Sequence, residues 1–216
     1  MLSHTSVTST HKFRTSLFTT AMLCASFALY AQTKVDTPAT PAAGEWTLST
    51  QGTGRSFAFS APPSSPGKPA PFSARFVGDP HSDKHSKGVV GVEIFIHDLA
   101  RYKGFDFDAF EGPDAPAAAK KLVIFTISAK GKAAVKMRFA AAGWYPQSDS
   151  FAFGMVEVSG KPGTPQKALL RELAADAESV QVTIVDFRDA ARTIELLVPV
   201  HSQGANFARL LEGMNR

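Results

Sequence analysis

The chain has 216 residues, enough for one hydrophobic core, and a formal net charge of +4. Lys12 and Arg14 supply two of these charges and lie in the N-terminal segment considered next, so the remainder of the chain carries only +2. No basic cluster is denser than the lysine pair at 120–121. Because nucleic-acid binding needs a concentrated basic footprint, we expect no nucleic-acid partner.

The N-terminus has the order of parts found in a secretory signal peptide. Lys12 and Arg14 precede the apolar run 17–31, which ends in small residues. This run is rich in Thr, Ser and Ala and is too short to span a bilayer, which needs about 20 predominantly apolar residues. We therefore predict that residues 1–31 are a signal peptide cleaved after Ala31, with Ala28 as the alternative. Cleavage leaves no transmembrane anchor and sends the protein to the periplasm or outside the cell.

The only cysteine, Cys24, lies inside this segment. Lipidation of a cysteine requires a small residue immediately before it, and here that residue is Leu23. Cleavage after residue 31 removes the cysteine, so the mature chain has no disulfide and depends on its core for stability. Residues 32–44, rich in Pro, Ala and Thr, are predicted to form a flexible linker, and 45–216 a single β-rich domain.

Short alternating segments follow the linker. The run 89–97 is the clearest, because branched apolar side chains alternate there with Gly91, Glu93, Phe95 and His97. This period of two is typical of an antiparallel sheet with one face in the core and one in water. The predicted strands before the last third of the chain are 46–52, 55–60, 71–77, 89–97, 121–128, 134–141 and 151–159.

The last third contains two helical patterns and two more strands. Thr164 is a predicted N-cap before a helix near 165–177, and the strands 179–187 and 191–200 form a predicted hairpin. Ser202 is the predicted N-cap of a C-terminal helix. Its apolar face consists of Phe207, Leu210, Leu211 and Met214. These elements predict a mainly β fold, an antiparallel β-sandwich with two short α-helices.

The polar segment 78–85 holds the weak candidates for a metal site, namely His81, Asp83 and His85. Imidazole and carboxylate groups are ligands for divalent transition metals. The favoured interpretation is a solvated loop, because glycine and Pro80 break regular structure there and no H-E-x-x-H motif is present. We therefore expect no metal and no cofactor.

A second candidate is the acidic pair Asp106 and Asp108. On a strand, residues two apart point the same way, which would permit paired acid–base catalysis. The alternative is a half-buried extended segment with a wet polar face, since phenylalanines alternate with the acids over 105–111. No G-x-S-x-G motif and no phosphate-binding loop accompany the pair. The sequence therefore assigns no catalytic residue.

Trp144 and Tyr145 are the predicted partner-binding residues, because exposed aromatics at a strand end anchor protein interfaces. The alternative is simple packing at a sheet corner.

The order of elements after residue 130 resembles that of exported bacterial proteins grouped with invasion-associated locus B. The features that carry this are the alternating strand around Phe139, the turn at Trp144, a helix over 168–175, a strand over 180–185 and an apolar helix over 206–211. Those proteins commonly carry cysteines in the mature domain, and this chain has none there. The resemblance implies a periplasmic or surface-associated role without a defined reaction.

Together these features predict an exported, non-enzymatic binding or accessory protein of the bacterial cell envelope. Its expected partner is a protein or another envelope component. The alternative is a small periplasmic hydrolase or a metal-dependent enzyme using the His81 loop or the acidic pair.

Overall fold

The computed structural model describes residues 44–212 except 53, 64, 66–67, 69, 81–88 and 159–163. The predicted signal peptide, its cleavage after Ala31 and the linker up to residue 43 lie outside the described residues. So do the candidate metal ligands His81, Asp83 and His85. These predictions therefore remain predictions.

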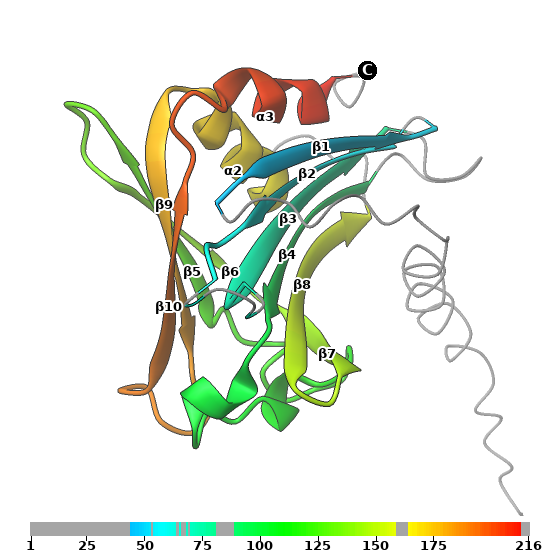
Figure 1. Cartoon of the computed structure of the whole chain (residues 1–216), viewed down its shortest axis with the longest axis vertical. Helices are drawn as coiled ribbons and strands as arrows, with labels where there is room; N and C mark the ends of the chain where they lie inside the picture. Colours follow the sequence, from blue (N-terminus) through cyan, green and yellow to red (C-terminus); the bar gives the residue numbers. More distant parts are fainter. Residues whose placement is uncertain are drawn as a thin grey trace, which may run out of the picture. The chain divides into compact units, whose positions relative to one another are not determined.

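Six strands form the larger sheet, with the order β1-β2-β3-β4-β8-β7 and antiparallel pairing throughout (Figure 1). Strands β1 to β4 follow one another both in the sequence and in the sheet. The next neighbour of β4 in the sheet is β8, which comes much later in the sequence. The strands are β1 (Trp46–Gln51), β2 (Gly54–Ser60), β3 (Phe72–Asp79), β4 (Val89–Ile96), β7 (Ala142–Gln147) and β8 (Ser150–Val158).

Four strands form the second sheet, with the order β10-β9-β5-β6, again antiparallel. They are β5 (Val123–Ala129), β6 (Val135–Phe139), β9 (Ala177–Val185) and β10 (Thr193–Pro199). The helices are α2 (Pro165–Ala174) and α3 (Gly204–Leu211), and the segment between β4 and β5 contains the 3-10 turns η1 (Leu99–Tyr102) and η2 (Asp108–Phe110). The predicted mainly β fold, an antiparallel β-sandwich with two short helices, is confirmed.

One hydrophobic cluster joins the inner faces of both sheets. Phe76 and Phe153 from the first sheet belong to the same buried cluster as Phe125 from the second. Because burying a side chain of this size contributes about 1.5–3 kcal/mol, the many phenylalanines provide much of the stability. The core therefore holds the sheets together without a disulfide in the described part of the chain.

The helices α2 and α3 pack against each other at one end of the sheets (Figure 1). The predicted N-cap is confirmed, since the Thr164 side chain accepts a hydrogen bond from the backbone N–H of Lys167. The helix ends at Ala174, before Asp176 adopts a left-handed φ of 61°. Gly204 lies so close to α2 that a Cβ there would be 2.9 Å from the carbonyl oxygen of Ala174. No helix among the described residues is both long and apolar enough to cross a membrane.

Three local predictions were wrong. The segment 142–147 is the edge strand β7 and not a turn. The segment 105–111 is not extended, because η2 occupies its second half. Gln203 precedes α3 in place of Ser202, which adopts a φ of 64°; the Gln203 side chain accepts a hydrogen bond from the Asn206 side chain and caps no backbone N–H of the helix.

Candidate functional site

The outer face of the six-stranded sheet, opposite the core, carries a group of polar and aromatic side chains that contact one another. Core-facing residues such as Phe76, Ile94 and Phe153 alternate with them along the strands. We call this group the outer-face cluster: Ser73, Arg75, Glu93, Phe95, His97 and Trp144.

One row of the cluster crosses four strands. Ser73 lies opposite Phe95, Phe95 opposite Ala152, and Ala152 opposite Trp144. Because Ala152 is small, the rings on either side of it meet, with centroids 6.2 Å apart and planes at 89°. This edge-to-face geometry is the favoured one for aromatic pairs. Residues that are far apart in the sequence thus form one aromatic surface.

Trp144 is held in place while much of its side chain faces solvent. Gly154 lies beneath the indole, since a Cβ built there would be 3.0 Å from Trp144 Cζ3. Trp144 nevertheless retains 38% exposure. A large, positioned and exposed aromatic side chain has little conformational entropy to lose when it binds a partner.

The next row holds an ion pair between Arg75 and Glu93, which lie directly opposite each other. Glu93 is 1% exposed, whereas the Arg75 side chain is 37% exposed and its guanidinium carbon lies 5.6 Å from the Phe95 ring centroid. Burial raises the pKa of Glu93 above its usual 4.5, although the charge and hydrogen bond of Arg75 act in the opposite direction. The arginine therefore covers the buried carboxyl and contacts the aromatic row.

His97 completes the cluster at the end of β4. Its ring stacks on Phe95, with the planes at 6° and the centroids 6.4 Å apart, and its Nε2 lies 3.1 Å from Ser73 Oγ. Burial lowers the pKa of His97 below 6.5, while the negative charge of Asp149 partly opposes this. The imidazole is therefore neutral at pH 7 and exchanges a hydrogen bond with a serine hydroxyl.

The two residues predicted to bind a partner point to opposite faces. Tyr145 packs against Phe151, with ring centroids 4.7 Å apart, and its hydroxyl donates a 2.5 Å hydrogen bond to Asp108 Oδ1. Burial raises the pKa of Tyr145, and the hydrogen bond to Asp108 and the charge of that carboxylate raise it further. Only Trp144 joins the outer-face cluster, because neighbouring residues on a strand alternate in direction.

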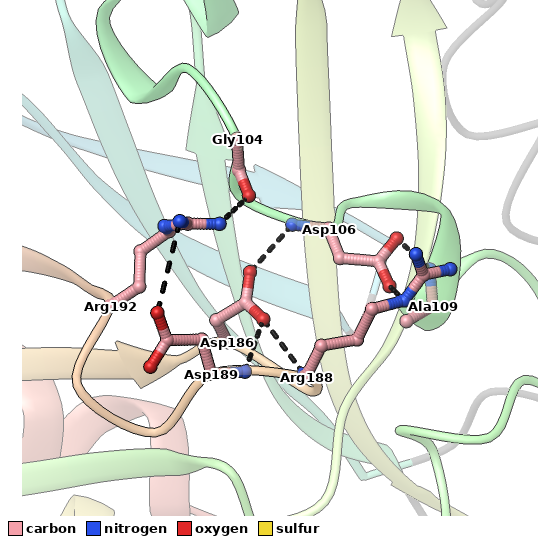
Figure 2. A network of polar contacts seen from close by, with 7 residues as sticks. All are labelled: Gly104, Asp106, Ala109, Asp186, Arg188, Asp189 and Arg192. Atoms are coloured by element: carbon pink, nitrogen blue, oxygen red, sulfur yellow. Dashed lines mark hydrogen bonds and ion pairs between the residues drawn. The ribbon is translucent and has the colours of Figure 1, made fainter.

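Asp106 and Asp108 are engaged separately. Asp106 Oδ1 accepts a hydrogen bond from the Ala109 N–H, and Asp106 Oδ2 pairs with Arg188 Nε at 2.7 Å (Figure 2). Asp108 binds Tyr145 instead. The parallel orientation expected for the two carboxylates depended on an extended segment, which the structure does not contain.

Figure 2 shows that Asp106 belongs to a network centred on Asp186, a carboxylate that is 2% exposed. Asp186 accepts backbone N–H groups from Asp106 at 2.7 Å, Arg188 at 2.8 Å and Asp189 at 2.9 Å. Burial opposes ionisation of Asp186, but these donors and the charge of Arg192 together lower its pKa. Arg192 also donates to the Gly104 carbonyl. The network ties the β9–β10 turn to the segment that follows η1.

Sequence reasoning missed most of the outer-face cluster. The alternation in 89–97 had placed Glu93, Phe95 and His97 on one face, expected to be in water. A carboxylate, an aromatic ring and an imidazole on one face were the sequence signal for this part of the cluster. Arg75 and Ser73 had no such signal, because their place beside β4 depends on strand pairing.

Comparison of the chain with known protein families, with characterised proteins and with solved structures gave no match. We therefore infer a function from the side chains of the outer-face cluster.

Proposed function

We propose that this chain is an exported, non-enzymatic binding or accessory protein of the bacterial cell envelope. The outer-face cluster is the surface that contacts its partner, a protein. The signal peptide predicted for residues 1–31 and the resemblance of residues 133–213 to invasion-associated locus B proteins support the proposed compartment.

The contact chain Arg75–Phe95–Trp144 carries this proposal. Trp and Arg are enriched among the residues that dominate protein interfaces, and here both are partly exposed on one face and contact the same ring. Arg75 pairs with Glu93, so covering these two residues leaves neither of their charges unpaired. A protein partner can bury the exposed indole at low cost in conformational entropy.

Site-specific photo-crosslinking tests the proposal. Benzoylphenylalanine placed at position 144 should crosslink one defined envelope protein when the chain is expressed in a bacterium. Position 197 is the matched control, because Leu197 is 62% exposed and belongs to β10 of the other sheet. Crosslinking at 197 to the same protein, or at neither position, contradicts the proposed surface.

The affinity of the crosslinked partner for variants of the chain then tests whether Trp144 is an interface anchor. Truncation of an interface anchor costs at least about 2 kcal/mol, so W144A should weaken binding about 30-fold. L197A should leave it unchanged. Equal affinity of W144A and the unaltered chain rejects the outer-face cluster as the binding surface.

Ester hydrolysis is a second candidate function, favoured by the contact between Ser73 Oγ and His97 Nε2. A neutral imidazole beside a hydroxyl can accept its proton while the oxygen attacks an acyl carbon. The charge of Asp149 acts on His97 and would stabilise the imidazolium that forms.

Hydrolysis of p-nitrophenyl acetate distinguishes the two functions. If the chain is a hydrolase, S73A and H97N should both remove the activity, while S179A on the other sheet should retain it. A rate no higher than that of free imidazole at equal concentration supports the binding function.

A further inference from the structure

The β5–β6 hairpin concentrates positive charge. The sequence from 115 to 148 contains no acidic residue, and four of its basic residues lie on the turn and on β6: Lys130, Lys132, Lys136 and Arg138. All four are exposed. Along the sequence they are spread among small and apolar residues, but the hairpin brings its two arms side by side (Figure 1).

The charge on the hairpin is not neutralised locally. No ion pair joins any of the four cations to another residue in the described part of the chain. At the base of the hairpin, Ala129 lies opposite Ala177, which Asp176 and Glu178 flank. The charged side chains of the tip, residues 130–136, are therefore all lysines.

The tip also carries apolar residues. Ala133, Ala134 and Val135 are exposed between Lys132 and Lys136, with Val135 at 39%. The turn extends away from the body of the sheet in Figure 1. Lysine on an edge strand such as β6 discourages strand-to-strand aggregation, but that role does not account for the lysines of the turn or for the exposed valine.

We propose that this hairpin tip binds the anionic headgroups of a phospholipid membrane, with residues 133–135 entering the headgroup layer. A convex tip fits a flat surface, its lysines complement phosphate groups, and the apolar segment between them gains from leaving water. The tip holds no aromatic residue on which bases could stack, since Phe125 and Phe139 are buried, which disfavours single-stranded nucleic acid. The inference is independent of the outer-face cluster, which lies on the other sheet.

Sedimentation of the full chain with vesicles tests this inference. Phosphatidylcholine vesicles with about 30 mol% phosphatidylglycerol should bind the chain more tightly than pure phosphatidylcholine, and about 0.5 M salt should remove the difference. Since each lysine near an anionic surface contributes about fivefold in affinity, K132Q/K136Q should bind the anionic vesicles about 25-fold more weakly. Lys12, Arg14 and the apolar run 17–31 are the same in every variant, so they do not produce a difference between variants.

K103Q/K121Q is the matched control, because it removes the same charge from exposed lysines outside the hairpin. It should bind like the unaltered chain. Equal losses in both double variants mean that only net charge matters, which overturns the hairpin assignment. If the chain shows no preference for anionic vesicles, the proposal is overturned as well. Binding to a labelled DNA duplex can be measured by fluorescence anisotropy. If K132Q/K136Q weakens that binding, the hairpin is assigned to nucleic acid instead.

Discussion

Arg75 and Glu93 pair across β3 and β4 with very different exposures, the carboxyl being buried and the guanidinium reaching solvent. A buried ion pair often costs as much in lost hydration as its attraction returns. Here the raised pKa of Glu93 indicates that the cost of burial is the larger effect. The pair therefore contributes a defined polar surface more than it contributes stability.

Replacing Glu93 by glutamine should leave the free energy of unfolding at pH 7 unchanged or raise it by about 1 kcal/mol, because the buried charge disappears and Arg75 remains hydrated. With its folded pKa raised, Glu93 adds stability that is fully present below pH 4.5 and is lost as the pH rises through the folded pKa. Urea unfolding of both chains between pH 4 and 7 measures the difference, which should grow in favour of E93Q as the pH rises. A loss above about 2 kcal/mol in E93Q at pH 7 contradicts this account.

His97 should titrate below pH 6.5 in the folded protein, because burial disfavours its charged form. Its stabilising contribution is present above pH 6.5 and is lost as the pH falls through the folded pKa. The imidazole resonances in an NMR titration report the midpoint, and H97N assigns them. A midpoint at or above 6.5 would mean that the ring is solvated and not held between Phe95 and Ser73.

Asp186 should be the most important carboxylate for stability among those of the network in Figure 2. D186N keeps the shape but loses the charge and one acceptor, so we expect a loss of about 2 kcal/mol at pH 7. The folded pKa lies below 3.8, so the contribution is present above pH 3.8 and is lost as the pH falls through that lower value. D114N, at an exposed position, should have no effect in the same urea unfolding experiment. If the two variants are equally stable, the network does not hold the β9–β10 turn.

Two glycines of β7 and β8 should respond differently to alanine. A Cβ at Gly143 would be 2.2 Å from the buried ring of Phe151 and 2.9 Å from the Ala152 carbonyl, so G143A should destabilise the fold by about 3 kcal/mol. A Cβ at Gly154 would be 3.0 Å from the partly exposed Trp144 ring and at an ordinary contact distance of 3.5 Å from the Ala142 carbonyl oxygen. G154A should therefore displace the indole at a smaller cost in stability.

Thermal unfolding measures the stability of both glycine variants. Tryptophan fluorescence in a W46F background, where Trp144 is the only tryptophan, measures the displacement of the indole. An unchanged Trp144 emission in G154A would show that the indole does not rest on that glycine.

Local sequence patterns, such as alternation along a strand or a capping residue before a helix, determined several of the elements. The alternation over 89–97 identified β4 and which of its residues share a face, but the face expected in water is mostly buried, with Glu93 only 1% exposed. Thr164 before Pro165 identified the start of α2. Pro146 interrupts the pattern of β7, which is tolerated because β7 is an edge strand with a shifted register between Trp144 and Gln147. The strand was therefore invisible to alternation alone.

Only the tertiary structure decided which residues meet. Phe95 and Trp144 become neighbours because β8 pairs with β4 and brings β7 behind it, a non-local choice that no short pattern encodes. The alternation of acids and phenylalanines in 105–111 predicted a half-buried extended segment, but the Asp106 N–H bonds to Asp186, which is distant in the sequence, and η2 forms instead. Elements follow from local periodicity, whereas strand order and long-range hydrogen bonds follow from how the whole core packs.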